Sequence, residues 1–121
     1  LVPKLVHHFV NKIPKIELGN VNVARDFSDV RDIAGYYAGI AALRPIGETI
    51  NLCSGSEHTL EKIIDFLSAL SNFQVEIQVK NHLQRRNEVD VLKGDRTKLD
   101  RLIAPKQQKH IEETLMWMLQ N

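Results

Sequence analysis

Hydrophobic residues recur at helical spacing in five segments of the chain. An apolar residue at every third or fourth position predicts helices over residues 3–12, 29–43, 60–70, 97–103 and 108–120. The third pattern is the clearest, because all its apolar residues share one face: Leu60, Ile63, Ile64, Leu67 and Leu70. Thr59 stands where an N-cap is expected, so the start of this helix is defined as well as its face.

Alternating apolar and polar positions predict a few short strands. Residues 16–18 and 21–23 alternate on either side of Gly19-Asn20, which predicts a hairpin that carries Arg25 out at its end. Further extended segments are predicted at 49–53, 75–79 and 89–92. Strands this few and this short make a poor sheet by themselves. We therefore expect a mixed α/β (α+β) fold in which some strands complete a sheet supplied by another part of the protein.

Length and charge narrow the classes of function. The 121 residues match one domain, 43% of them are hydrophobic, and the formal net charge is only +1. Such a chain has no global field to attract nucleic acid. No apolar run approaches the length of about 18 residues that predicts a membrane helix. Cys53 is the single cysteine, which excludes an internal disulfide and fits a reducing, cytoplasmic compartment.

Two arginine-bearing segments are the strongest candidates for a binding site. The first reads Arg25-Asp26-Phe27-Ser28-Asp29-Val30-Arg31-Asp32, and the second reads Arg85-Arg86-Asn87-Glu88-Val89-Asp90. A guanidinium from each of two distant segments could clamp a diphosphate, because arginine presents a rigid fork of donors that fits phosphate oxygens. Two plainer alternatives stay open. Arg25 could pair with an aspartate of its own segment, and Arg85 and Arg86 could belong to a solvated basic strip.

The two segments and the motifs between them resemble a known family. Leu18-Gly19-Asn20 leads into the first segment, and Ile50-Asn51-Leu52-Cys53-Ser54-Gly55-Ser56 follows a predicted helix. Arg85-x-x-Glu88-Val89-Asp90 then precedes Gly94-Asp95 and Lys98. In this order they are similar to the C-terminal, substrate-binding part of extended short-chain dehydrogenases, the NAD-dependent epimerase/dehydratase family that acts on nucleotide sugars. The last motif looks most like the branch of GDP-mannose 4,6-dehydratase and GDP-4-keto-6-deoxymannose reductase.

The resemblance spans residues 1–121, which would form one sugar-nucleotide-binding C-terminal domain of a Rossmann-type enzyme. By position, Arg25 and Arg85 would contact the substrate diphosphate, and Glu88 would accept hydrogen bonds from ribose hydroxyls. Lys4 would lie near the phosphates or the sugar. The chain departs from the branch at Arg86, where proline is usual, and at 104–110, where the family commonly has Gly-Trp and Pro. These departures concern the shapes of loops rather than the clamp.

The chain lacks the residues that perform chemistry in this family. It contains no G-x-G-x-x-G pattern, and neither Tyr36 nor Tyr37 has a lysine four residues on. The resemblance therefore implies that NAD or NADP binds to an N-terminal Rossmann half outside this chain. The chain alone is expected to be inactive and to hold no catalytic residue. No metal site is expected either, because the aspartates lack the geometry of a calcium loop and no third ligand joins Cys53 and His58.

The start of the chain fits the same interpretation. Leu1 falls inside a periodic apolar stretch, so we expect a fragment or a processed product. A fragment would expose an apolar surface where the cofactor-binding half packs, and it would tend to self-associate. The alternative is a free-standing phosphoryl-binding or protein-binding module without an enzymatic partner.

Overall fold

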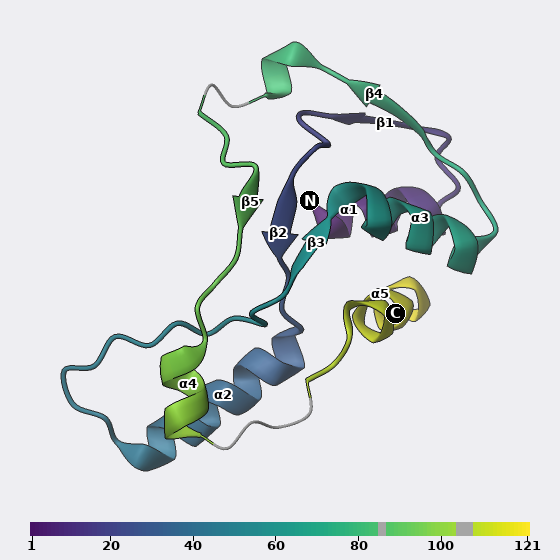
Figure 1. Cartoon of the computed structure of the whole chain (residues 1–121). Coiled ribbons are helices and arrows are strands. Elements are labelled where there is room, and N and C mark those ends of the chain that lie inside the picture. The colour runs from purple at the N-terminus through teal and green to yellow at the C-terminus, as the bar shows by residue number, and fades with distance from the viewer. Residues whose placement is uncertain (85–86, 104–107) are drawn as a thin grey trace.

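The structure, a computed structural model, describes residues 1–84, 87–103 and 108–121 and has a mixed α/β fold (Figure 1). Its elements in chain order are α1 (Val2–Val10), β1 (Lys15–Leu18), β2 (Ala24–Asp26), α2 (Val30–Leu43), β3 (Glu57–Thr59), α3 (Leu60–Ser71), β4 (Glu76–Val79), the 3-10 helix η1 (Asn81–Leu83), β5 (Val91–Leu92), α4 (Thr97–Leu102) and α5 (Ile111–Gln120). The predicted fold class and all the predicted helices are confirmed, with ends that shift by a few residues. None of the helices in the described part of the chain is long and apolar enough to cross a bilayer.

The strands form two small sheets. β1 pairs in parallel with β4, from Lys15 opposite Glu76 to Leu18 opposite Val79. β2 is the centre of the other sheet, antiparallel to β3 and parallel to β5. The predicted hairpin is therefore wrong, because β1 and β2 follow each other in the chain but lie in different sheets. The second predicted strand, at 21–23, is displaced as well, because β2 begins only at Ala24. Alternation on both sides of a turn does not say that the two segments pair with each other.

The predicted strand at 49–53 is also wrong. These residues belong to neither sheet of the described structure. Asn51 instead donates a side-chain hydrogen bond to the Asp95 carbonyl oxygen at 3.2 Å. The strand in this region is β3, which begins after the Ser54-Gly55-Ser56 turn and pairs with β2. An alternating segment becomes a strand only where a neighbouring backbone completes its hydrogen bonds, and no described segment does so for residues 49–53.

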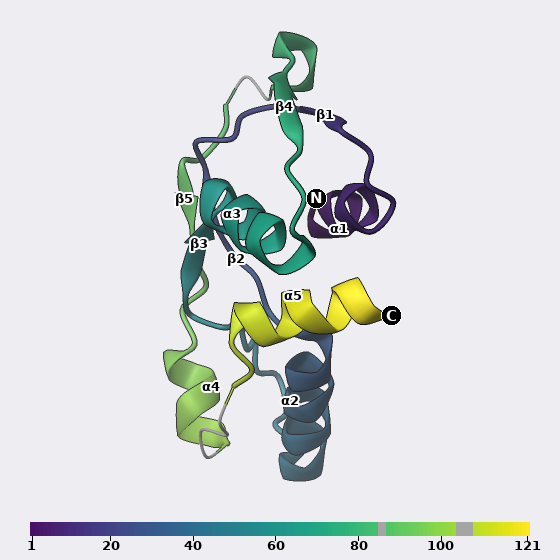
Figure 2. The same cartoon turned by 90° about the vertical axis from the view of Figure 1, so that its right-hand side faces the viewer.

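The main core lies where α1, α3 and α5 meet β1. In Figure 2, α5 crosses between the α1–α3 pair on one side and α2 on the other. The largest fully buried side chains of this core are Leu5, Phe9, Ile16, Leu60, Ile63, Leu67 and Leu115. The apolar face predicted for α3 is confirmed except at Leu70, at the end of the helix, which is 39% exposed.

Asp29 connects the first turn of α2 to α5 by hydrogen bonds. Asp29 Oδ1 caps α2 by accepting hydrogen bonds from the Arg31 backbone N–H and from Arg31 Nε, each at 2.8 Å. Asp29 Oδ2 accepts from Arg31 Nη2 at 2.5 Å and from the Thr114 hydroxyl of α5 at 2.7 Å. The hydrogen bonds from Arg31 outweigh burial and hold the pKa of Asp29 far below its usual range. The Arg31 guanidinium also lies over the Trp117 ring of α5, 4.7 Å from its centroid.

Candidate functional site

Arg25 and Glu88 lie together although 63 positions separate them in the sequence. Arg25, in β2, donates from Nη2 to Glu88 Oε1 at 3.1 Å. Its Nη1 donates to the carbonyl oxygens of Ala24 at 2.9 Å and Asp90 at 3.2 Å. Only 22% of the Arg25 side chain and 19% of the Glu88 side chain are exposed. Arg25 therefore pairs with the second segment rather than with an aspartate of its own segment.

This pair lines a cavity of about 300 Å³. Leu18, Phe27 and Leu60 contribute apolar walls, and Asn20 also lines the cavity. The volume lies at the small end of the range of roughly 300–1,000 Å³ that is typical of ligand pockets. A partly apolar cavity with a few convergent polar groups is the usual form of a small-molecule site.

Gly19 lets two walls of the cavity approach each other. A Cβ atom at Gly19 would lie 2.4 Å from the Leu83 carbonyl oxygen and 2.9 Å from the Leu83 carbonyl carbon. The Lys80 N–H donates to the Leu18 carbonyl oxygen at 2.8 Å, which extends the β1–β4 pairing toward η1. The β1–β2 loop therefore touches the backbone of the segment that leads to Glu88.

The Arg25 guanidinium keeps part of its hydrogen-bonding capacity. Its three hydrogen bonds to described residues use both hydrogens of Nη1 and one of Nη2. Arginine has two more N–H donors, on Nε and Nη2, and no described residue accepts from them. Glu88 Oε2 likewise accepts no hydrogen bond from a described residue, and the bond from Arg25 is made to Oε1. A ligand could therefore bind both groups without breaking the ion pair.

Of the other two predicted contacts, Lys4 and Arg85, only Lys4 lies among the described residues. Lys4, on α1, donates from Nζ to the Glu17 carbonyl oxygen at 2.6 Å. It is exposed and is not among the residues that line the cavity. Arg85 and its neighbour Arg86 lie outside the described residues. The roles of Lys4 and Arg85 at a substrate stay predictions.

A second polar cluster lies beside the pair and was missed in the sequence. The Asp26 carboxylate accepts hydrogen bonds from the backbone N–H groups of Ser54 at 3.0 Å, Gly55 at 2.9 Å and Gly94 at 3.2 Å, and from the Ser54 hydroxyl at 2.6 Å. We call these four residues the Asp26 cluster. Burial alone would raise the pKa of Asp26, but the hydrogen bonds outweigh it and lower that pKa below its usual value.

Two glycines make the Asp26 cluster sterically feasible, and they were the signal that could have revealed it. Gly55 has a φ of +74°, a backbone conformation that other residues adopt at a cost. A Cβ atom on Gly94 would lie 2.5 Å from Cys53 Sγ. Cys53 itself is buried, as expected, and burial raises the pKa of its thiol. Both glycines belong to the motifs on which the family resemblance rests.

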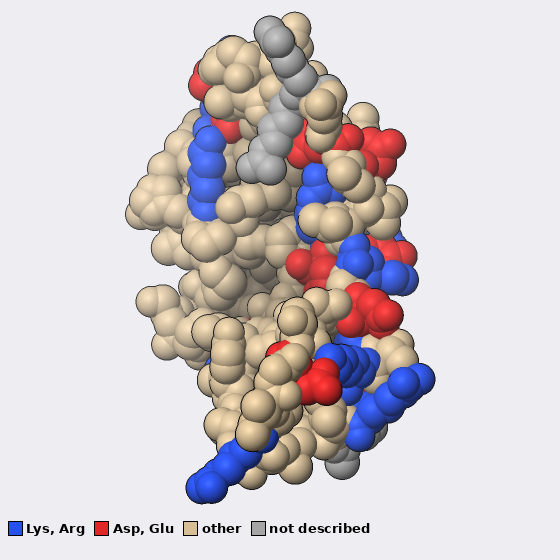
Figure 3. All heavy atoms as spheres, turned by 90° about the vertical axis from the view of Figure 1, so that its left-hand side faces the viewer, with Lys and Arg blue, Asp and Glu red and all other residues tan. Residues whose placement is uncertain are grey.

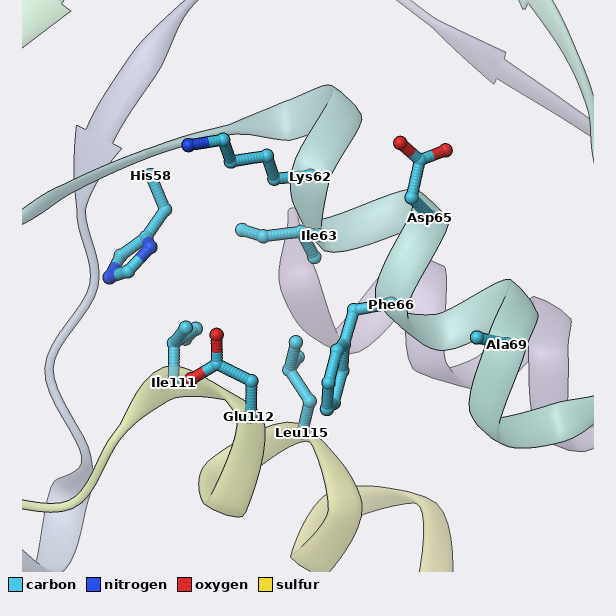
Figure 4. A pocket seen from close by; sticks show the side chains of 9 residues that line it. All are labelled: His58, Lys62, Ile63, Asp65, Phe66, Ala69, Ile111, Glu112 and Leu115. Atoms are coloured by element: carbon cyan, nitrogen blue, oxygen red, sulfur yellow. The ribbon is translucent and has the colours of Figure 1, made fainter.

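A larger cavity, of about 400 Å³, lies between α3 and α5 (Figure 4). Ile63, Phe66 and Leu115 give it an apolar lining, and His58 and Glu112 lie on opposite sides of it. None of the predicted site residues lines this cavity. The smaller cavity, where Arg25 and Glu88 meet, is therefore the candidate site.

On the face of the molecule shown in Figure 3, basic and acidic side chains are interspersed, most of them along the right-hand side of the view. This agrees with the formal net charge of +1. Attraction of an anion on this face therefore depends on local groups rather than on a broad basic patch. Within residues 1–84, 87–103 and 108–121, no three His, Cys, Asp or Glu side chains are arranged to hold a metal ion.

No family model matches the chain. In sequence and in fold the chain nevertheless resembles one part of enzymes named as nucleotide-sugar dehydrogenase, reductase and epimerase, so the resemblance inferred from the sequence is confirmed. The chain is 35% identical over 99 residues, 82% of its length, to GDP-6-deoxy-D-talose 4-dehydrogenase of Aggregatibacter actinomycetemcomitans. It is 28% identical over 105 residues, 87% of its length, to GDP-6-deoxy-D-mannose reductase of Pseudomonas aeruginosa.

Solved structures show the same relationship. A proposed epimerase from Burkholderia cenocepacia J2315 matches 99% of the chain with a TM-score of 0.95 and 38% identity. The protein RMD from Pseudomonas aeruginosa, in complex with NADPH, has the same fold over 98% of the chain, with a TM-score of 0.88 and 23% identity. The chain spans 34% of the length of each curated relative and 40% and 41% of these two structures.

Proposed function

We propose that this chain binds the nucleotide diphosphate of a nucleotide sugar, preferably a GDP-sugar, for an NAD(P)-dependent epimerase, dehydratase or reductase. The observation that carries the proposal is the meeting of Arg25 and Glu88 in one cavity, in a chain similar to enzymes of GDP-sugars. A diphosphate needs a cation with donors to spare, and a ribose needs an acceptor for its hydroxyls. The pair offers both within one hydrogen-bonded unit.

The proposed roles follow from the groups that are still available. Arg25 Nε and the second hydrogen of Nη2 would donate to diphosphate oxygens, while the Nη1 bonds to Ala24 and Asp90 hold the guanidinium in place. Glu88 Oε2 would accept from the ribose hydroxyls. Arg85 would supply a second cation, and Lys4 would lie near the phosphates or the sugar. The binding energy would serve to place the sugar ring for a reaction performed by groups outside this chain.

The preference for GDP rests on the curated relatives, both of which are named for GDP-6-deoxy sugars. UDP is therefore the competitor against which the base preference is to be measured.

NAD or NADP would bind to another part of the same enzyme, because this chain has no G-x-G-x-x-G turn and two of its helix starts are already capped. A dinucleotide site uses free N–H groups in a glycine-rich turn at a helix N-terminus. Asp29 already occupies the first-turn N–H of α2, and Thr59 that of α3. A cofactor held elsewhere would supply hydride chemistry, and this chain would orient the substrate toward it.

Replacing Arg25 with alanine is expected to weaken GDP binding by at least about 1 kcal/mol, or roughly fivefold, because a charged hydrogen-bond donor is lost. Calorimetric titration of the full chain with GDP and UDP measures the change, and Glu88→Gln should also weaken both nucleotides. The matched control is Lys93→Ala. Lys93 is a nearby cation that does not line the cavity, and its Nζ pairs with Glu57 at 2.9 Å. If Arg25→Ala binds GDP as tightly as Lys93→Ala does, the proposal fails.

An apolar surface on and after α2 is where we propose that the cofactor-binding part packs. Tyr37 is 66% exposed, Leu43 52% and Ile46 95%. Ile40, Ile50 and Leu52 line a hollow of about 400 Å³ beside them. Soluble domains rarely leave such a patch uncovered without a partner for it.

We expect residues 1–121 alone to self-associate through this surface. Light scattering should show that Tyr37→Ser combined with Ile46→Ser reduces the apparent mass. The control, Val10→Ser, removes a 52% exposed apolar residue of α1 and should leave that mass unchanged. A parent chain that is strictly monomeric and does not bind an apolar dye would contradict the expectation.

A further inference from the structure

We propose that Asp26 is a positioning residue that holds Glu88 opposite Arg25 by fixing the register of β5 on β2. This inference deepens the proposed function and rests on it. It also gives a role to Ser54-Gly55 and Gly94, the motif residues that bind no part of the proposed substrate.

β5 is too short to fix its own register on β2. It comprises only Val91 and Leu92, which pair with Ala24 and Arg25. A shift of one residue in a strand pairing moves every side chain to the opposite face. Glu88 precedes β5 by a few residues, so such a shift would move it away from Arg25.

Two hydrogen bonds bracket β5 and prevent this shift. Before the strand, the Ala24 N–H donates to the Asp90 carbonyl oxygen at 2.8 Å, and the same oxygen accepts from Arg25 Nη1. After the strand, the Gly94 N–H donates to Asp26 Oδ2 at 3.2 Å. The second bond is charge-assisted, which makes it the stronger kind of anchor.

Asp26 can hold Gly94 firmly because several other hydrogen bonds fix the position of its carboxylate. The N–H groups of Ser54 and Gly55 and the Ser54 hydroxyl bind the same carboxylate, at 3.0, 2.9 and 2.6 Å. Arg25 and Asp26 are consecutive in β2, so their side chains leave the strand on opposite faces. Arg25, the proposed substrate contact, therefore lies on one face of β2. Asp26, whose hydrogen bond with Gly94 holds β5 in register, lies on the other face.

The test uses Asp26→Asn, which preserves shape but removes the charge and turns an amide N–H₂ toward N–H donors. We expect GDP affinity to fall by about tenfold. The matched control is Asp29→Asn, since Asp29 is a buried carboxylate with four hydrogen bonds, all made to α2 and α5. It should destabilise the full chain to a similar degree and leave GDP affinity in the folded protein unchanged.

A double-mutant cycle separates positioning from a general loss of structure. If Asp26 acts through Glu88, Asp26→Asn should have little further effect on GDP affinity in a Glu88→Gln background. Equal effects in both backgrounds would overturn the inference. So would an Asp26→Asn protein that binds GDP as the parent does.

Amide hydrogen exchange gives a readout that needs no ligand. The Ala24 N–H, bonded to Asp90, should exchange at least about tenfold faster in Asp26→Asn than in Asp29→Asn under native conditions. If the parent chain bound neither GDP nor UDP, the proposed function would fail, and this rate would still decide whether Asp26 holds β5. Equal protection of Ala24 in the two variants would overturn the inference.

Discussion

Gly19→Ala is expected to lower the free energy of unfolding by about 2–3 kcal/mol and to weaken GDP binding at the same time. A Cβ atom at this position would lie 2.4 Å from the Leu83 carbonyl oxygen, closer than a real contact allows. Because the obstacle is backbone, the β1–β2 loop and η1 must move apart. That movement widens the cavity and shifts the segment that leads to Glu88. Urea unfolding and calorimetry with GDP measure the two effects.

The matched control for this substitution is Gly35→Ala. Gly35 lies inside α2, and a Cβ atom there would meet nothing within 4 Å. Alanine is the better helix former by roughly 1 kcal/mol, so this variant should be as stable as the parent or more stable. A Gly19→Ala protein with the stability and GDP affinity of the parent would show that Leu83 gives way without cost, and the contact would lose its proposed importance.

The helices could be predicted from the sequence because their determinants are local. Thr59 was expected to cap α3, and its hydroxyl does accept from the Lys62 N–H at 3.3 Å. α2 begins at Val30, one residue after the predicted start, because Asp29 caps the helix by accepting from an N–H only two residues on. The residues that make such short-range contacts lie close together in the sequence, so a short segment around the helix start already contains them.

The strand pairing could not be predicted, because it depends on segments far apart in the chain. β1 pairs with β4 about sixty residues later, and alternation at residues 16–18 does not identify that partner. Strands of two to four residues also carry too few side chains to specify a neighbour. The error at 49–53 has the same cause, since its apolar alternation says nothing about which backbone lies beside it.

Some residues of the candidate site could likewise be predicted from the sequence, whereas their contacts could not. Arg25 and Glu88 were named from a resemblance, but the sequence did not indicate that they form an ion pair. Asp26 was missed because three of its five hydrogen bonds come from backbone N–H groups, which every residue except proline possesses. Only the glycines at 55 and 94 marked the places where the backbone had to come close.

Asp29→Ala is expected to lower the free energy of unfolding at pH 7 by about 3 kcal/mol. The substitution removes the cap of α2 and the closer acceptor of the Thr114 hydroxyl of α5, which keeps only its 3.4 Å bond to the His110 carbonyl oxygen. It also frees Arg31 from a carboxylate whose side chain is only 1% exposed. Urea unfolding at pH 7 measures the loss. Glu76→Ala is the control, because Glu76 pairs with Lys15 on the surface, where such pairs contribute little.

The contribution of Asp29 should also depend on pH in a defined direction. The pKa of Asp29 is lowered in the folded chain by the hydrogen bonds from Arg31, so the folded state binds a proton less readily than the unfolded state does. The stabilisation is therefore fully present above the unfolded pKa of about 4 and is lost as the pH falls toward the folded pKa. Asp26, whose pKa is also lowered, acts in the same direction. The difference in free energy of unfolding between the parent and Asp29→Ala should shrink as the pH falls from about 5 to about 2, a range set by the unfolded pKa. A difference that stays constant across this range would contradict the ionised hydrogen-bond network at the start of α2.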